Sequence, residues 1–130
     1  MFICGSGSAV LFRHISRKVG EPKRIVWEGD SRDVIRGFPA TVRDDLGAAL
    51  RALQIGERPH DSKPIKAVGA GAWEIRAKDP AGQFRAIYVA LVKGEIHVLH
   101  CFQKKSQKTS RPDLATAAAR YRELALRFKG

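Results

Sequence analysis

Four cations follow an apolar segment near the end of the chain and could bind phosphate. Residues 95–102 are typical of a buried strand, and residues 103–111 then carry four cations without any acid: Lys104, Lys105, Lys108 and Arg111. Ser and Thr hydroxyls lie between them. Cations interleaved with hydroxyl donors suit contacts with a phosphate-rich polymer. A solvated loop is the alternative interpretation, because strand ends also carry lysines for solubility.

The charge of the whole chain supports an anionic partner. Its 130 residues include 24 Lys and Arg against 13 Asp and Glu, a formal net charge of +11, and such an excess attracts anions. The charge is uneven: residues 103–130 hold eight cations and two acids, whereas residues 25–62 hold five cations and seven acids. We therefore expect the anion-binding surface in the second half of the chain.

Arg85 is a further candidate, because it lies inside an apolar segment predicted to be a central strand over residues 84–92. An arginine in such a strand is rarely buried without a partner. Either an acid such as Glu74 pairs with it, or it faces a polar ligand from a solvent-facing position. The residue alone leaves both interpretations open.

A two-residue turn at Lys93-Gly94 would pair this strand with residues 95–102 as a hairpin. Arg85 then lies opposite Phe102, and His100 opposite Ile87, and cross-strand partners share a face. One face would therefore gather cationic, histidine and aromatic side chains, with Ile96 and Val98 on the same face: Arg85, His100, Phe102 and Lys104. A bulge in the strand would place Lys105 on this face in place of Lys104, so both lysines stay candidates.

The remaining pattern predicts an α+β fold, with an N-terminal strand and helices packed on a small antiparallel sheet and a C-terminal helix. Residues 1–22 are interpreted as an N-terminal extension, either poorly ordered or a short helix, and residues 23–130 as one domain. The predicted elements follow in order: a strand at 24–27, a helical turn from Asp30-Ser31, a helix from Pro39 to about 55, a turn-rich connector over 57–71, a strand at 73–78, a turn at 79–82, the hairpin, and a helix from Pro112 to Phe128.

Two local signals refine the helices. Thr41 and Asp44 have the spacing of a capping box. The last helix carries an apolar stripe that ends at Phe128, with Glu123 and Arg127 at i,i+4 spacing beside it.

Several classes of function are not indicated. Cys4 and Cys101 are too few for a disulfide framework or a zinc site, and the four histidines lack metal-ligand spacing. We expect no metal and no cofactor, a core position for Cys101 and an exposed one for His97. The first residues lack the order of a secretory signal, and no apolar run is long enough for a membrane span. A cytoplasmic location without membrane contact is expected.

The chain resembles the RelE/HigB superfamily of bacterial toxin–antitoxin toxins, in particular its phage-derived, HigB-like branch. The likeness runs from about Lys23 to Arg127. The motifs that carry it are Val26-Trp-Glu-Gly-Asp-Ser-Arg-Asp33, Phe38-Pro39, Lys63-Pro-Ile-Lys66, Trp73-Glu-Ile-Arg76, Phe84-Arg-Ala-Ile-Tyr88 and Leu99-His-Cys-Phe-Gln-Lys-Lys-Ser-Gln-Lys-Thr109.

The resemblance implies a RelE-like fold and a metal-independent endoribonuclease that cleaves mRNA at the ribosome. It places a catalytic cluster of Lys and Arg on the sheet, at Arg76, Arg85 and Lys104 or Lys105, and Lys66 as an outlying RNA-binding candidate. Lys108 and Arg111 are expected to bind RNA as well. The implied partners are mRNA, the ribosome and a cognate antitoxin from the adjacent gene, expected to contain a helix-turn-helix domain.

The chemistry of RNA cleavage agrees with these side chains. When a 2′-hydroxyl attacks the neighbouring phosphate, negative charge grows on the phosphorane, and fixed cations stabilise it. Arginine cannot serve as the base, and the tyrosine of some family members has no counterpart at residues 110–114. The base is then His100, a lysine of lowered pKa, or ribosomal RNA. Two other functions stay open: a non-catalytic RNA-binding module, and a gyrase-inhibiting toxin of the same fold.

Overall fold

A five-stranded sheet forms the centre of the computed structural model, which describes residues 21–90 and 94–129. Its strands are β2 (Arg24–Trp27), β3 (Ser62–Pro64), β4 (Ala72–Asp79), β5 (Gly82–Val89) and β6 (Glu95–Lys104). The strand order is β2-β6-β5-β4-β3. β2 pairs with β6 in parallel and the other pairs are antiparallel. The sheet is therefore mixed, where the sequence predicted an antiparallel one, while the α+β class is confirmed.

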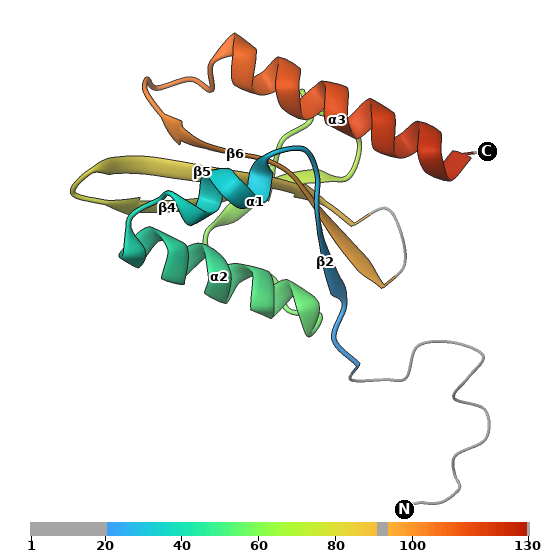
Figure 1. The fold of residues 1–130 in the computed structure, drawn as a ribbon, viewed down its shortest axis with the longest axis horizontal. Helices are drawn as coiled ribbons and strands as arrows, with labels where there is room; N and C mark the ends of the chain where they lie inside the picture. The colour runs from blue at the N-terminus through green and yellow to red at the C-terminus, as the bar shows by residue number, and fades with distance from the viewer. Residues whose placement is uncertain (1–20, 91–93, 130) are drawn as a thin grey trace, which may run out of the picture.

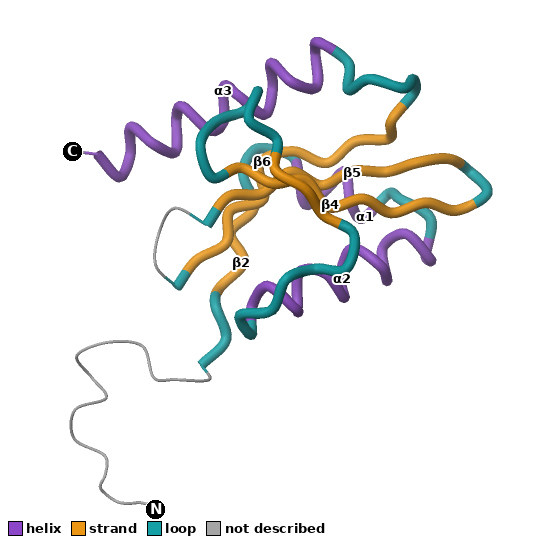
Figure 2. The backbone as a smooth tube through the Cα atoms, turned by 180° about the vertical axis from the view of Figure 1, so that it is seen from behind, coloured by secondary structure: helices purple, strands orange, loops and turns teal. Residues whose placement is uncertain are grey.

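Helices cover both faces of the sheet. α1 (Ser31–Arg36) and α2 (Ala40–Gln54) pack on one face, and α3 (Arg111–Lys129) runs along the other (Figure 1; Figure 2 from behind). The core under α1 and α2 includes Leu46, Ile75 and Val98. The core under α3 includes Ile87, Leu99 and Leu124. None of the helices in the described ranges is long and apolar enough to cross a membrane.

Alternation along β4 and β5 assigns side chains to these two cores. Ile75 of β4 and Ala86 of β5 point to the α2 side, whereas Ile87 and Val89 of β5 belong to the core under α3. The predicted turn between the strands is present, and Gly82 adopts a φ of 140° there. A side chain at this position would be strained. The turn therefore fixes the register in which β4 and β5 pair.

A β-bulge in β6 changes the predicted face assignment. Arg85 lies opposite Phe102 and Ile87 opposite His100, as expected, but Tyr88 then pairs with Val98, so Leu99 is the extra residue. The shift moves Ile96 and Val98 to the α2 core and leaves Leu99 in the core under α3. The assignment of Ile96 and Val98 to the face of Arg85 was wrong, because one inserted residue inverts the alternation beyond it.

Helix ends differ in detail from the sequence pattern. The Thr41 hydroxyl donates to Asp79 at 3.2 Å instead of accepting from the Asp44 backbone N–H as in a capping box, and α2 has no side-chain cap. α3 begins one residue earlier than expected, with the Ser110 hydroxyl accepting from the Asp113 backbone N–H at 3.2 Å. Phe128 is 56% exposed rather than part of a buried stripe. A tertiary contact thus replaces the predicted capping box at the start of α2, whereas a local side-chain cap begins α3.

Some predictions fall partly or wholly outside the described residues. The extension predicted over residues 1–22 has only residues 21 and 22 within them, and the proposed turn residue Lys93 lies outside. The connector over 57–71 contains β3, which the sequence pattern did not indicate. β3 is only three residues long and pairs with the edge of β4.

Candidate functional site

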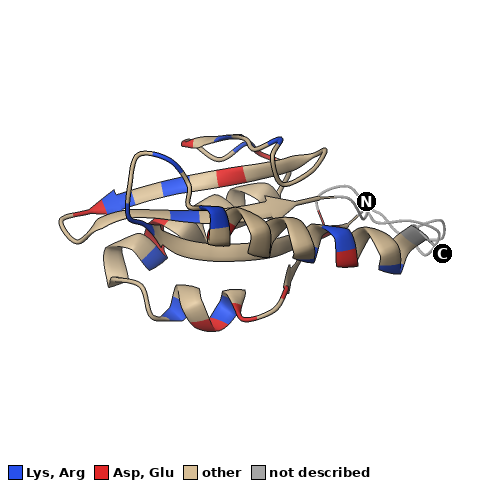
Figure 3. Cartoon of the chain, turned by 90° about the horizontal axis from the view of Figure 1, so that it is seen from above, with Lys and Arg blue, Asp and Glu red and all other residues tan. Residues whose placement is uncertain are grey.

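Sheet pairing brings distant cations together on the α3 side of β3, β4, β5 and β6. Arg76 of β4 lies opposite Arg85 of β5, and Gln83 of β5 lies between Lys78 and Lys104 on its two neighbours. We call this surface the cationic face; its cations are Lys63, Arg76, Lys78, Arg85 and Lys104. In Figure 3, Lys and Arg segments colour the strands toward the β4–β5 turn. Strand pairing thus brings cations that are as far apart in the sequence as Lys63 and Lys104 together in one surface patch.

Arg85 forms the buried floor of this face. Only 5% of the residue is exposed, and its Nε lies 3.8 Å from Oε2 of the buried Glu74. Its Nη1 donates to the Phe84 carbonyl at 3.0 Å and its Nη2 to the Gln83 side chain at 3.0 Å. Of the two interpretations left open, pairing with Glu74 is the observed one, and a solvent-facing Arg85 was wrong. Burial, partly offset by Glu74, lowers the pKa of Arg85.

Glu74 cannot neutralise the surrounding cations. Its carboxylate is 4% exposed, with Oε1 lying 3.6 Å from Nζ of Lys63. Neither Glu74 Oε2 nor Arg85 Nε has a hydrogen-bond partner among the described residues. A single carboxylate is therefore shared by two cations on the floor of the cationic face.

Lys104 lies at the rim of the face, and the cationic field acts on it. Burial and the charges of Arg85, Lys63 and Arg76 lower the pKa of Lys104, while Glu74 opposes the shift. A lowered pKa raises the share of neutral amine at a given pH. The lowered pKa therefore makes Lys104 a candidate proton acceptor.

Arg76 is held at the edge of the sheet by Asp61. Its Nε donates to Asp61 Oδ1 at 2.8 Å, and its Nη2 lies 2.7 Å from the same oxygen. The Arg76 side chain is 37% exposed. Its guanidinium is thus oriented and still open to solvent at one side.

His100 is tied to the start of α3 rather than free on the cationic face. Its Nε2 lies 2.8 Å from Oδ1 of Asp113, whose other oxygen accepts from the Ser110 hydroxyl at 2.6 Å. The ring stacks on Phe102 with centroids 5.3 Å apart. Its Nδ1 is buried without a partner among the described residues. As placed, His100 joins β6 to α3 through Asp113.

The other candidates lie around or away from the cationic face. Lys105 lines a hollow beside Lys104, together with Gln83 and residues 106 and 107. Lys66, Lys108 and Arg111 are exposed, and none of the ion pairs between described residues joins their side chains to the cationic face. The Ser106 hydroxyl is used within its own loop, since it donates to the Lys108 carbonyl at 2.8 Å. The face thus collects Arg76, Arg85 and Lys104, with Lys105 at its border.

Sequence reasoning missed three contributors. Lys78 could have been found, because it alternates with Arg76 on the polar face of the predicted strand. Lys63 could not, because its place depends on the pairing of β3 with β4. Asp113, the partner of His100, was missed as well, because their contact joins β6 to the start of α3.

The beginning of β6 is charged as well, but there the charges are balanced. His97 is 2% exposed, not exposed as predicted, with Nδ1 2.8 Å from Glu28 and Nε2 3.1 Å from Glu95. Arg127 donates to both Glu28 oxygens at 2.9 Å, instead of pairing with Glu123, and Arg24 pairs with Glu95. We call these five residues the closed network. It joins β2, β6 and α3.

Cys101 lies in the core as expected. It is 1% exposed, and burial raises the pKa of its thiol to about 12. A thiol that stays protonated is a poor nucleophile.

The fold and the site define an α+β protein with an open cationic sheet face. The chain belongs to the family described as "Phage derived protein Gp49-like", whose profile matches residues 33–122. This confirms the phage-derived family that the sequence resemblance indicated, and the HigB-like branch stays a prediction. No curated protein shows significant sequence similarity to the chain.

Two solved structures of the E. coli toxin RelE are similar to the chain. A RelE mutant in the free state has a TM-score of 0.48 and 17% identity, over 82% of this chain and 98% of that one. The isolated RelE toxin has a TM-score of 0.48 and 15% identity, over 81% and 97%.

Proposed function

We propose that this chain is the toxin of a toxin–antitoxin pair, and that it cleaves mRNA at the ribosome without a metal ion. The observation that carries the proposal is the cationic face, where Arg76, Arg85 and Lys104 converge from three strands around the single buried Glu74. Membership of the phage-derived family and the sequence resemblance to RelE/HigB toxins support it.

The roles follow from the charge that develops during cleavage. Attack of a 2′-hydroxyl on the adjacent phosphate forms a phosphorane, expels the 5′-oxygen and leaves a 2′,3′-cyclic phosphate. Arg85 and Arg76 are assigned to the growing negative charge, because fixed cations in a partly desolvated site stabilise a transition state. Lys104 is assigned to the 2′-hydroxyl proton, because its pKa is lowered. His100 is assigned a supporting role, since Asp113 already engages its Nε2.

A comparison of two neighbouring lysines tests the reaction. The chain would be induced in cells and new mRNA 5′ ends mapped for the parent, Lys104→Ala and Lys105→Ala. General acid–base catalysis typically contributes about 10²–10⁴ in rate, so Lys104→Ala should remove nearly all cleavage. Lys105→Ala removes an equal positive charge from the neighbouring residue, and this variant should keep most of the cleavage. Undiminished cleavage by Lys104→Ala would refute the site.

The pH profile separates a base from a fixed cation at position 104. If the neutral amine takes the proton, the single-turnover cleavage rate rises with pH until the pKa of Lys104 is passed, because deprotonation creates the active form. A rate that falls over that range would show that the ammonium form is required. Lys104→Ala provides the control, since its profile should lack this titration.

The proposed partner is an antitoxin with a helix-turn-helix domain, encoded next to this chain. Co-expression should restore growth, and affinity purification of the chain should recover the neighbouring gene product. A plain RNA-binding module would instead recover RNA without creating new 5′ ends. A gyrase-inhibiting toxin would change DNA supercoiling and leave mRNA intact.

A further inference from the structure

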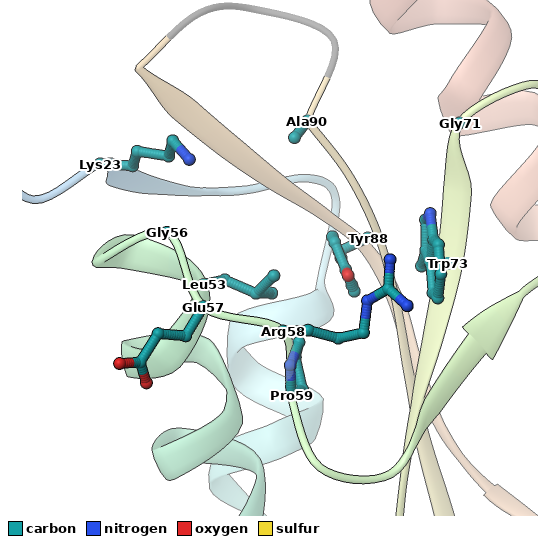
Figure 4. A pocket seen from close by; sticks show the side chains of 10 residues that line it. All are labelled: Lys23, Leu53, Gly56, Glu57, Arg58, Pro59, Gly71, Trp73, Tyr88 and Ala90. Carbon is teal, nitrogen blue, oxygen red and sulfur yellow. The ribbon is translucent and has the colours of Figure 1, made fainter.

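A second hollow lies on the other face of the sheet, where β4 begins and β5 ends. It has a volume of about 330 Å³, and its lining includes two cations and two aromatic side chains: Lys23, Arg58, Trp73 and Tyr88 (Figure 4). Ligand pockets typically range from about 300 to 1,000 Å³. The hollow is large enough for one planar group, and neither the cationic face nor the closed network accounts for it.

Arg58 is the main feature of this hollow. Its guanidinium carbon lies 5.0 Å from the centre of the Trp73 ring, and the side chain extends between Trp73 and Tyr88 in Figure 4. Trp73 also packs against the core on the α2 side. The described contacts of the exposed Arg58 include no hydrogen bond or ion pair of its guanidinium. A planar cation is thus held by stacking, while its donors remain available to a ligand.

Lining residues shared between neighbouring hollows link this hollow to the cationic face. Arg58 and Pro59 also line a neighbouring hollow beside α2, which shares Asp61, Arg76 and Lys78 with a further hollow that reaches Arg85. That further hollow shares Gln83 with the hollow that holds Lys104 and Lys105. These shared residues place the four hollows in a series that passes around the sheet edge at residues 58–61, and we call this series the groove. Asp61 lies along this path, but its carboxylate is already engaged by Arg76.

We propose that single-stranded RNA next to the cleaved phosphate follows this groove, and that one base stacks on the Arg58–Trp73 pair. The inference depends on the proposed function and adds a binding site outside the reacting atoms. Single-strand binding combines a cationic groove along the backbone with planar groups on which bases stack. Arginine planes serve as such groups in RNA recognition. An acidic protein segment would match the charge but would make no use of the exposed planar stack.

The test measures binding without cleavage, using the full chain and 2′-O-methyl oligouridylates of two lengths. The short oligonucleotide can cover only the cationic face, and the long one can also reach Arg58. Loss of one stacked base weakens binding by roughly tenfold, so Arg58→Ala should weaken binding of the long oligonucleotide by about that factor and leave the short one unchanged. Arg58→Lys keeps the charge but not the plane, so it should retain the salt dependence without restoring full affinity.

Arg43→Ala is the matched control, because Arg43 is an exposed cation on α2 outside the groove. It should leave both affinities unchanged. If Arg58→Ala binds both lengths like the parent, while Lys104→Ala loses binding, the groove is refuted and the proposed function stands. If the parent binds neither length, both proposals fail. If Arg58→Ala binds RNA normally but loses the antitoxin, the groove belongs to a protein partner and the RNA path is refuted.

Discussion

Charged side chains at the beginning of β6 are fully paired, whereas those at its end are not. At its beginning, His97 and Glu95 belong to the closed network, where each carboxylate has two cationic or histidine partners within hydrogen-bond reach. At its end, Lys104 borders a face on which Arg85 and Lys63 share one buried carboxylate, Glu74. One strand thus carries an ionic cluster whose charges are balanced at its beginning and a cluster with an excess of cations at its end.

The difference separates stabilising charge from charge kept for a ligand. Buried charges that are paired and hydrogen-bonded hold elements together, and the closed network joins β2, β6 and α3. Excess cations repel one another, and here they add to the effect of burial in lowering the pKa of Lys104. Such a face gains stability when an anion binds it, because ligand binding to the folded state favours that state.

The largest expected effect is that of Arg85→Ala, which should damage both function and stability. It should reduce mRNA cleavage by about 10²–10³. It also leaves Glu74 buried beside Lys63 alone, and breaking a buried ion pair costs roughly 3–5 kcal/mol. Urea unfolding measures the loss of stability. The double variant Glu74→Gln/Arg85→Gln should recover stability without cleavage. Recovery of cleavage as well would show that Arg85 is only structural.

The next effect concerns the lysines at the end of β6 and in the loop beyond it. Neutralising Lys104, Lys105 and Lys108 together should weaken binding to RNA of every sequence. For each phosphate that the protein no longer neutralises, the slope of log K against log salt should decrease by about 0.7 for single strands. The control changes three exposed arginines on the opposite side: Arg32, Arg36 and Arg43. Equal slopes for both triple variants would mean that general charge, and not this surface, binds RNA.

A smaller effect is expected from His97→Phe in the closed network. The substitution keeps a ring but removes the hydrogen bonds to Glu28 and Glu95, and leaving buried polar groups unsatisfied costs about 1–3 kcal/mol. Urea unfolding should detect this loss, whereas mRNA cleavage should stay at the parent level. Reduced cleavage in a fully folded His97→Phe variant would contradict the division between the two ends of β6.

The smallest effect is the pH dependence of the closed network. Burial raises the pKa of both Glu28 and Glu95, but hydrogen bonds and charges lower it by more. For Glu28 these come from Arg127 and His97, and for Glu95 they come from Arg24 and His97. Both values therefore lie below the ordinary 4.5. Because the unfolded chain takes up these protons first, the stabilisation is complete above that pH and is lost as the pH falls through the folded-state values.

Urea midpoints measured from neutral to acid pH check this prediction. The midpoint of the parent should fall in the acid range below about pH 4.5, in addition to the contribution of other carboxyls. Glu28→Gln should show a shallower fall, because it removes one of the two titrating groups. An identical pH profile for the parent and Glu28→Gln would mean that the network adds nothing to acid sensitivity.

Much of the fold followed from local signals in the sequence. The turn at residues 79–82, the paired strands around it and the long last helix were predicted because turn residues and periodic apolar positions encode them locally. The hairpin predicted between residues 84–92 and 95–102 placed Arg85 opposite Phe102, as the structure confirms. The phage-derived family was also recognisable from motif order alone.

The site depended on contacts between distant segments. The bulge at Leu99 follows from how β6 packs between two cores, and no local signal distinguishes Leu99 from its apolar neighbours. Arg85 could have faced a ligand or an acid, and only the pairing of β4 with β5 decided for Glu74. The burial of His97 and the stacking of Arg58 on Trp73 join segments far apart in the chain. The sequence by itself determined which charges this protein carries and which strands and helices form around them. Only the tertiary structure decided which charges are paired and which stay available, because pairing requires distances that only packing sets.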